Sequence, residues 1–162
     1  MVKGSLYETY NAIIPVYERT SRAITLGFLV KWRRETLNLG LRVLNDPGSG
    51  LSVLDAGSGP GSMTIELIKS GVKLRRIVLL DQSTAMLNAA LNLNYIDKVC
   101  GSFEHMPFRD SVFNMVIMGF SLHTASDLRR TYCEISRVLN DEGVLASVSI
   151  GKPTNPVYRA LG

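Results

Sequence analysis

A glycine-rich turn carries the residues most suited to chemistry. Gly57, Gly59 and Gly61 follow an apolar run and open a segment with helical spacing. Glycine is needed where the chain turns with positive φ and where a ligand must touch the backbone, and the free amides at a helix start then face that ligand. Asp81 ends the next apolar run, where an acid can accept hydrogen bonds from two ribose hydroxyls. The spacing predicts a site for an adenosine cofactor. The alternative is a set of tightly packed glycines with a surface aspartate.

Asp55 discriminates between two kinds of adenosine cofactor. The dinucleotide pattern G-x-G-x-x-G needs a glycine at position 62, where this chain has Ser62. Asp55 lies just ahead of the turn, where a carboxylate would repel a pyrophosphate and attract an ammonium group. S-adenosylmethionine carries an ammonium group and a sulfonium and has no phosphate. The local charges therefore favour S-adenosylmethionine over NAD.

The elements that must position these residues follow from the periodicity of the chain. Apolar runs predict strands at residues 51–55, 76–81, 98–101, 113–118 and 144–150. Segments with helical spacing alternate with them at residues 62–70, 83–92 and 127–139. Ser83 is expected to cap the second of these helices, and a turn ending at Gly143 is expected before the fifth strand. Continuous apolar strands that alternate with helices imply a parallel sheet covered on both faces.

The first part of the chain has a different pattern. Residues 5–44 read as helical, broken near Pro15 and Gly27, and a dense turn signal follows at residues 45–50. We therefore predict an N-terminal helical cap over residues 1–48 and a core domain over residues 49–162.

Basic residues gather in this cap, at Lys31, Arg33, Arg34 and Arg42. Only Glu35 opposes them locally, in a chain whose net charge is +4. Together with Trp32 they are interpreted either as a solvated helix face over the core or as a peripheral contact with an anionic membrane. A net charge this small gives no strong nucleic-acid signal.

Composition excludes several classes of protein. Hydrophobic residues make up 46% and charged residues 20%, which is typical of a globular chain and not of a disordered or collagen-like one. No apolar stretch reaches the length of a membrane span, and the N-terminus lacks an apolar signal core. Cys100 and Cys133 have no metal-ligand spacing and cannot staple a domain of this size. We expect a cytoplasmic protein without a metal site.

The motifs resemble those of the class I S-adenosylmethionine-dependent methyltransferases. Residues 53–61 (VLDAGSGPG) look like the family's first motif, and residues 81–87 (DQSTAML) look like its second. Residues 104–116 and 137–143 resemble the segments that lead into its fourth and fifth strands. Residues 10–34 and 149–156 are similar to segments of the ubiquinone/menaquinone biosynthesis branch. The resemblance implies an α/β fold with a Rossmann-like, doubly wound, mostly parallel sheet of about five strands and an N-terminal helical cap.

The resemblance also implies roles for individual residues. Gly57, Gly59 and Gly61 would shape the methionine side of the cofactor site, with Asp55 nearby, and Asp81 would bind the ribose. The residues bordering the adenine would be Gln82, Met86, Ser102 and Phe103. Ser102 stands where the family usually has an acid or amide, and its uncharged hydroxyl weakens that contact.

Two further positions belong to the methyl-transfer end of the site. Gly119, with Phe120 and Ser121 after it, would face the transferred methyl group. His123 follows the fourth strand and is the candidate general base for a phenolic carbon nucleophile. The alternative for His123 is an exposed or structurally satisfied histidine.

The function implied by the resemblance is S-adenosylmethionine-dependent methylation of a small-molecule acceptor, with a quinone precursor suggested, by in-line methyl transfer. An RNA or protein methyltransferase is one alternative, although residues 119–122 (GFSL) lack the Asn/Asp-Pro-Pro-Tyr pattern of many amino-group methylators. A non-catalytic cofactor-binding protein with a degenerate substrate site is another, and a dehydrogenase is more distant.

Length adds one more expectation. At 162 residues the chain has room for five of the seven strands usual in the family, so the closing antiparallel pair is expected to be missing. The fifth strand would then be an apolar edge, which soluble proteins rarely leave uncovered. We expect a second copy, as in a homo-oligomer, a partner chain or the C-terminal tail to cover it.

Overall fold

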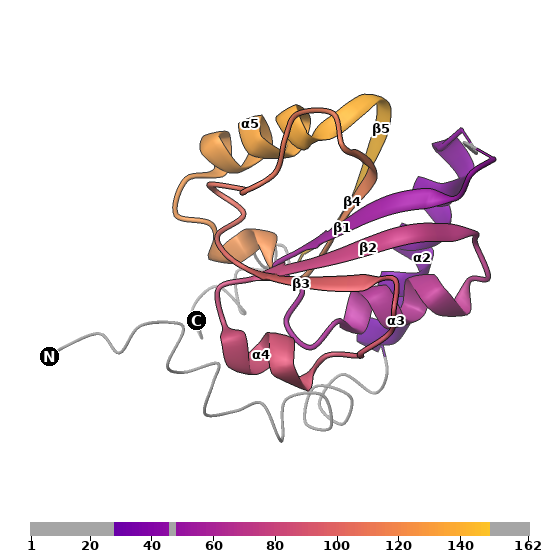
Figure 1. Ribbon diagram of the computed structural model, residues 1–162, viewed down its shortest axis with the longest axis horizontal. Helices are drawn as coiled ribbons and strands as arrows, with labels where there is room; N and C mark the ends of the chain where they lie inside the picture. Colours follow the sequence, from indigo (N-terminus) through magenta and orange to yellow (C-terminus); the bar gives the residue numbers. More distant parts are fainter. Residues whose placement is uncertain (1–27, 46–47, 150–162) are drawn as a thin grey trace, which may run out of the picture.

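Five parallel strands form the sheet of the computed structural model, which describes residues 28–45 and 48–149 (Figure 1). The strands are β1 (Leu51–Ala56), β2 (Leu74–Asp81), β3 (Ile96–Cys100), β4 (Phe113–Gly119) and β5 (Leu139–Val148). Their order is β3-β2-β1-β4-β5, and every neighbouring pair runs parallel. The order reverses between β1 and β4, which is the switch point where ligands bind in open α/β sheets. The predicted α/β, Rossmann-like fold is confirmed.

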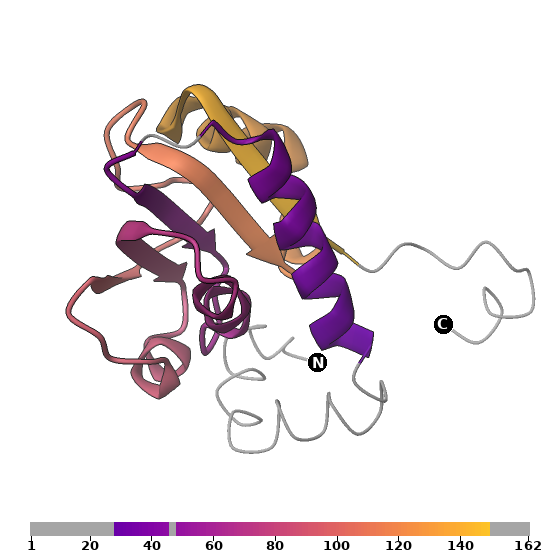
Figure 2. The same ribbon diagram turned by 90° about the vertical axis from the view of Figure 1, so that its right-hand side faces the viewer.

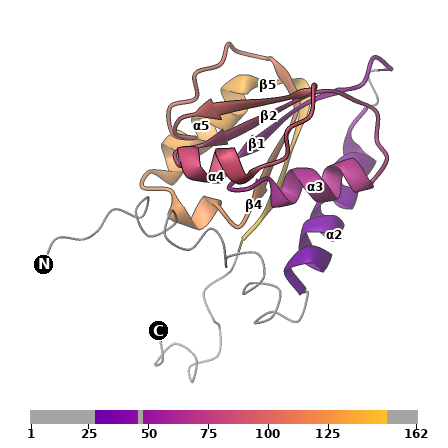
Figure 3. The same ribbon diagram turned by 60° about the horizontal axis from the view of Figure 1, so that its bottom comes forward.

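Helices cover both faces of this sheet. They are α2 (Phe28–Val43), α3 (Ser62–Lys69), α4 (Thr84–Ala89) and α5 (Leu128–Val138), with a 3-10 turn η1 (Leu122–Thr124). Leu37 of α2, Leu67 of α3 and Leu87 of α4 pack into one apolar core, and Ile135 of α5 packs into a second. Figure 2 shows α2 and α5 on opposite sides of the sheet, and Figure 3 shows α3 and α4 on the side of α2.

The central strand β1 is buried along its whole length. Val53 belongs to the core under α2 and α3, and its neighbour Leu54 belongs to the core under α5. Alternation of this kind is expected for a strand covered on both faces. It fixes the backbone at the end of β1, and therefore the position of Asp55.

Helix α2 lies close against the sheet because Gly40 has no side chain. A Cβ at Gly40 would come within 2.6 Å of Met115 Cε and 3.0 Å of Ala146 Cβ. Arg33 and Leu37 lie on the same helix face and are buried. The helical prediction is confirmed over residues 28–43, while residues 1–27 of the cap lie outside the described residues. The domain division at residue 48 stays a prediction.

The prediction of a turn before the fifth strand is wrong. β5 begins at Leu139, which pairs with Phe113, and the pairing then moves to Met115 with Val144. The residues between Leu139 and Val144 therefore bulge within the strand. Gly143 permits this, since a Cβ there would lie 2.9 Å from the carbonyl oxygen of Asn140.

The helix predicted over residues 83–92 is shorter than expected and ends at Ala89. Ser83 is its N-cap, as predicted, because its Oγ accepts a hydrogen bond of 3.2 Å from the Met86 amide. The chain becomes extended at Ala90, whose carbonyl accepts a hydrogen bond of 2.9 Å from Lys98 Nζ.

Strand β5 pairs only with β4 among the described residues, so it is an edge of the described sheet. Residues 150–162 lie outside the described residues. They include all but the first residue of the segment 149–156 that resembles the quinone branch. The expectation that something covers β5 therefore stays a prediction. None of the described helices is long and apolar enough to cross a membrane.

Candidate cofactor and acceptor site

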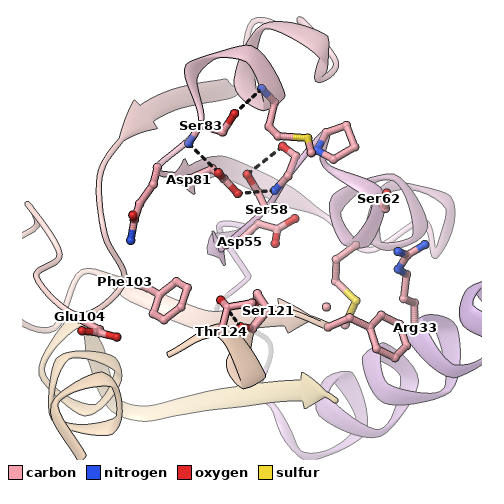
Figure 4. A pocket seen from close by; sticks show the side chains of 18 of the residues that line it. Arg33, Asp55, Ser58, Ser62, Asp81, Ser83, Phe103, Glu104, Ser121 and Thr124 are labelled. Carbon is pink, nitrogen blue, oxygen red and sulfur yellow. Dashed lines mark hydrogen bonds between the residues drawn. The ribbon is translucent and has the colours of Figure 1, made fainter. Parts of the chain in front are cut away.

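A cavity of about 270 Å³ lies at the carboxyl ends of β1, β2 and β4 (Figure 4). This is close to the lower end of the range of roughly 300–1,000 Å³ that is typical of small-molecule sites. The predicted residues that line it are Asp55, Gly57, Gly59, Asp81, Gln82, Met86, Phe103 and Gly119. The predicted residues absent from its lining are Gly61, Ser102 and His123.

The glycine loop is held by its own amides. The Gly57 and Ser58 amides both donate to the Leu80 carbonyl, at 2.8 and 3.1 Å, and the Gly59 amide donates to Asp81 Oδ2 at 2.8 Å. The Gly61 amide donates to the Ser58 carbonyl at 2.9 Å. These four loop amides are therefore used inside the protein, and the expectation that free amides at the start of α3 face a ligand stays a prediction. A loop whose donors are used internally is poorly suited to cradle a phosphate.

Any side chain at Gly57 would be strained and would overlap Ser121, because the loops after β1 and β4 meet there. Its φ is 69°, and a Cβ there would lie 2.5 Å from Ser121 Cβ. Ser121 in turn donates to the Ala56 carbonyl at 2.9 Å. The loop after β4 is thereby fastened to the loop after β1, and both line the cavity.

Asp81, at the end of β2, connects three elements. Its Oδ2 accepts from the Gly59 amide at 2.8 Å and its Oδ1 accepts from the Ser83 amide at 2.8 Å. The side chain is half-buried at the cavity wall (Figure 4). A carboxylate oxygen can accept more than one hydrogen bond, so Asp81 retains capacity for hydroxyl donors.

Asp55 is fully buried and has one unsatisfied oxygen. Its Oδ2 accepts from the Thr64 amide at 3.2 Å and from Thr64 Oγ1 at 2.7 Å. Its Oδ1 has no hydrogen-bond partner among the described residues, although Asp55 lines the cavity. Burial raises the pKa of Asp55 to about 7, against the two bonds from Thr64, which lower it. A cationic donor in the cavity would complete this site.

Arg33 is a site residue that the sequence interpretation missed. The sequence places it in a basic cluster with Lys31, Arg34 and Arg42, which are exposed, yet Arg33 is 5% exposed and lines the cavity. Its guanidinium carbon lies 5.5 Å from the centre of the Phe120 ring. The signal was its spacing, because Arg33 is four residues before Leu37 and on the same helix face.

The adenine side of the predicted site has an apolar wall. Met86 and Phe103 are buried there, and the exposed Gln82 lies beside them in the lining. Ser102 is withdrawn, because its Oγ accepts from the Glu104 amide at 3.0 Å. Glu104 lines the cavity instead, and its Oε1 accepts hydrogen bonds from the Ser126 and Asp127 amides.

The loop after β4 forms the opposite wall. Phe120 is buried with a φ of 60°, which is rare for a bulky residue. Its amide donates to the Val148 carbonyl at 2.8 Å, and its ring centre lies 6.4 Å from that of Trp32. A Cβ on Gly119 would approach Met63 Sδ to 3.3 Å. His123 lies exposed on η1, next to the lining residue Thr124.

These features define a Rossmann-like domain with a cavity at its switch point. The family model for a methyltransferase domain matches residues 54–147, and the chain belongs to this family. The match covers β1 through most of β5, including every residue of the cavity except Arg33.

Curated relatives extend the comparison to the N-terminal segment. The chain is 28% identical over 162 residues to a demethylmenaquinone methyltransferase of Listeria welshimeri, covering 96% of this chain and 66% of the relative. It is 32% identical over 149 residues to a demethylmenaquinone methyltransferase of Mycobacterium bovis, covering 92% of this chain and 60% of the relative. The chain thus spans about two thirds or less of the length of these relatives.

Solved structures agree on the fold. The YcgJ protein of Bacillus subtilis superposes with a TM-score of 0.64 at 23% identity, over 76% of this chain and 54% of that one. A Methanococcus maripaludis protein described as a candidate S-adenosyl-L-methionine-dependent methyltransferase gives a TM-score of 0.65 at 25% identity, over 81% of this chain and 61% of that one. Together the matches indicate S-adenosylmethionine as the methyl-donor cofactor.

Proposed function

We propose that this protein is an S-adenosylmethionine-dependent methyltransferase that acts on a small aromatic acceptor, a quinone precursor. The observation that carries the proposal is the unsatisfied Oδ1 of the buried Asp55, beside a glycine loop whose amides are already used. That combination suits a cofactor that presents an ammonium group and no phosphate.

Each part of the cofactor is matched by residues that line the cavity. Asp55 would accept a hydrogen bond from the ammonium group, and Asp81 would accept from the ribose hydroxyls. Met86 and Phe103 would pack on the adenine, which is the apolar part of the cofactor. The aspartates lie between Phe103 on one side and Arg33 on the other (Figure 4).

The protein's task in this reaction is alignment. S-adenosylmethionine supplies a methyl group that its sulfonium already activates. Gly119 and the strained loop residue Phe120 form the wall where an acceptor would approach, and Ser121 fastens that wall to the glycine loop. Fixed positions of this kind lower the entropic cost of bringing the acceptor carbon, the methyl carbon and the sulfur into line.

Aromatic side chains support a planar acceptor. Phe120 lies in the cavity wall, Trp32 lies 6.4 Å from it, and Phe28 lies 6.0 Å from Trp32, centre to centre. The row leads from the cavity to the surface, because Trp32 and Phe28 are exposed. The names of the curated relatives, demethylmenaquinone methyltransferases, favour a quinone precursor among planar acceptors.

We keep His123 as the proposed general base for a phenolic acceptor. It lies exposed on η1, between Leu122 and the lining residue Thr124, so its ring would have to turn toward the bound acceptor. His123→Ala is expected to lower kcat while leaving the affinity for S-adenosylhomocysteine unchanged. An unchanged kcat would remove His123 from the mechanism.

An apolar stripe on α2 supports peripheral contact with a membrane that holds a lipophilic acceptor. Its residues, all exposed and on one helix face, are Phe28, Trp32, Leu39 and Val43. Lys31 and Arg42 flank the stripe. Co-sedimentation with phosphatidylglycerol vesicles should fall at least several-fold in a Trp32→Ser, Leu39→Ser variant. Equal binding of the variant and the original chain would contradict membrane contact through α2.

Turnover tests the reaction itself. The full chain is incubated with S-adenosylmethionine and a demethylated quinone precursor, and methylated product is followed by mass spectrometry. Product formation supports the proposal. Cofactor binding without product would favour a non-catalytic protein, and product on RNA or protein substrates alone would favour the other class of methyltransferase.

A further inference from the structure

Glu104 joins two loops that both line the cavity. It follows β3 and lies next to the buried Phe103 of the predicted adenine wall (Figure 4). Its Oε1 accepts hydrogen bonds from the amides of Ser126 and Asp127, the second at 3.2 Å, just before α5. Its carbonyl oxygen accepts from Arg130 Nε at 3.2 Å. One half-buried residue thereby ties the loop after β3 to the segment that leads into α5.

This second loop, residues 120–127, is called the η1 segment, and it is fastened at both ends. At its start, the Phe120 amide donates to the carbonyl at the end of β5 at 2.8 Å. Ser121 Oγ donates to the Ala56 carbonyl at 2.9 Å. At its far end, the carboxylate of Glu104 accepts the two amides described above. The η1 segment is therefore suspended between β1, β5 and Glu104.

The residues between these two ends bond to one another. The amide and Oγ1 of Thr124 both donate to the Ser121 carbonyl, at 2.9 and 2.7 Å, and the Ala125 amide donates to the Leu122 carbonyl at 3.2 Å. Leu122 and Ala125 also pack against the core under α5, but apolar contacts of this kind are not directional. The placement of the turn, and of His123 within it, therefore depends on how the two ends are held.

The loop that carries Glu104 is itself fixed. Its amide donates to Ser102 Oγ at 3.0 Å, so the hydroxyl predicted to border the adenine holds the backbone of Glu104 instead. Two residues on, the Met106 amide donates to Glu134 Oε2 at 2.6 Å. Hydrogen bonds from Arg137 lower the pKa of Glu134 to about 2, so this acceptor stays charged at neutral pH. Glu104 therefore attaches the η1 segment to a rigid support.

Helix α5 has its own N-cap and does not depend on Glu104 for its start. Asp127 Oδ1 accepts from the Arg130 amide at 2.9 Å. The Asp127 carbonyl accepts from the amide and the hydroxyl of Thr131, at 3.0 and 2.8 Å. A cap of this kind satisfies the first amides of a helix. The two bonds to Glu104 are therefore available to place the η1 segment.

We infer that Glu104 is a positioning residue for methyl transfer, which holds the η1 segment so that Phe120, Ser121 and Thr124 keep the acceptor wall in place. The inference rests on the proposed function and adds a residue that acts through this segment. Charge-assisted hydrogen bonds are short and directional, which suits them to this role. A misplacement of about 1 Å can cost roughly a hundredfold in rate even when the altered residue is far from the chemistry.

Kinetics on the full chain test the inference with two substitutions and a matched control. Glu104→Ala removes the acceptor oxygens, whereas Glu104→Gln keeps an Oε1 that can accept both amides. Glu142→Ala is the control, because Glu142 accepts from Asn45 Nδ2 at 3.2 Å and does not line the cavity.

The substrates are S-adenosylmethionine and a demethylated quinone precursor. Glu104→Ala should lower kcat at least about tenfold, while Glu104→Gln should stay within about threefold of the original chain. Glu142→Ala should leave kcat unchanged. The affinity for S-adenosylhomocysteine, measured by calorimetry, should stay within about twofold in all three variants, because the cofactor contacts are retained.

Amide hydrogen exchange gives a second readout that needs no acceptor. The Ser126 and Asp127 amides should exchange at least about tenfold faster in Glu104→Ala than in the original chain, because their hydrogen bonds are lost. Glu104→Gln should restore their protection. The Gly57 amide, which donates to the Leu80 carbonyl, should exchange at the same rate in every variant.

The outcomes separate the inference from the function on which it rests. An unchanged kcat or unchanged exchange of the two amides in Glu104→Ala would overturn the inference. A parallel loss of S-adenosylhomocysteine affinity would also overturn it, because Glu104 would then bind the cofactor directly, and faster exchange throughout the sheet would show a general structural role. If the original chain methylated no quinone precursor, the proposed function would fail, and the exchange measurement would still decide whether Glu104 holds the η1 segment.

Discussion

Burial of the ionised Asp55 carboxylate destabilises the folded protein. Its pKa is raised to about 7 because the group is fully buried, and its Oδ1 has no partner among the described residues. The folded protein therefore binds an extra proton between the ordinary aspartate pKa and about 7. Stability should fall as pH rises through that window and level off above it.

Asp55→Asn tests this cost directly. The amide oxygen can still accept from Thr64, and no charge remains to be buried. The free energy of unfolding of the variant should exceed that of the original chain by at least about 1 kcal/mol at pH 8, and the difference should vanish near pH 4. Denaturant melts at the two pH values measure it. If the free energies of unfolding of the variant and the original chain changed in the same way between pH 4 and pH 8, Asp55 would not be a buried carboxyl group with a raised pKa.

The same substitution should weaken ligand binding while it stabilises the fold. Asp55→Asn is expected to bind S-adenosylhomocysteine at least about tenfold more weakly at pH 8, because the charge-assisted contact with the ammonium group is lost. If Asp55→Asn raised the free energy of unfolding and lowered the affinity for the ligand, Asp55 would be a residue kept for binding and not for stability. Unchanged affinity by calorimetry at pH 8 would argue against its assigned contact.

At the scale of elements, the junction of two loops is the most constrained part of the site. Gly57 combines a φ of 69° with a close approach to Ser121, whereas Gly59 has a φ of 53° and nothing within 4 Å of its Cβ position. A side chain at Gly59 would therefore meet backbone strain alone, whereas a side chain at Gly57 would meet both backbone strain and a steric contact.

Gly57→Ala should destabilise the protein by at least about 2 kcal/mol, because strain and overlap add. Gly59→Ala is the matched control and should cost about 1 kcal/mol from its left-handed backbone alone. Ser121→Gly removes the overlap but also loses the hydrogen bond to the Ala56 carbonyl, so it serves as its own reference. In the Ser121→Gly background, Gly57→Ala should cost about as much as Gly59→Ala costs in the original chain. Thermal melts of the original chain and the four variants measure these costs, and equal costs for the two alanine variants in the original chain would contradict a close contact between the two loops.

Sequence patterns predicted the elements well where local composition and tertiary pairing agree. The apolar runs of β1 and β4 and the cap at Ser83 are local signals, and the structure has them. Asn140 and Gly143 have turn composition, which predicts a turn, while pairing of β5 with β4 keeps them in the strand as a bulge. The spacing of Arg33 and Leu37 places both on one face of α2, but that this face is buried depends on the packing of α2 at Gly40, which the basic cluster around Arg33 does not indicate.

The residues of the candidate site also divide into those that the sequence predicts and those that it does not. Asp55, Gly57, Gly59 and Asp81 were predictable, because a strand followed by a glycine turn places them together by chain continuity. Ser102 and His123 are sequence neighbours of lining residues, yet their loops direct them elsewhere: Ser102 Oγ accepts from the Glu104 amide, and His123 lies exposed on η1. Proximity in sequence does not determine which way a loop side chain turns.

At the scale of the whole molecule, the edge strand β5 is the feature to test. It pairs only with β4 in the described ranges, and the chain spans 60–66% of the length of its curated relatives. We predict that a second copy, a partner or residues 150–162 cover this edge. Light scattering and amide hydrogen exchange on the full chain test it, and a monomer whose β5 amides exchange like those of an open strand would contradict it.

One calorimetric comparison tests most directly which cofactor the protein binds. S-adenosylmethionine, S-adenosylhomocysteine and NADH are titrated into the full chain and into Asp81→Ala, which loses the predicted ribose contacts. S-adenosylmethionine and S-adenosylhomocysteine should bind the original chain and NADH should not, and Asp81→Ala should weaken the binding of the first two ligands more than tenfold. Binding of NADH alone, or full affinity for S-adenosylhomocysteine in Asp81→Ala, would contradict this expectation.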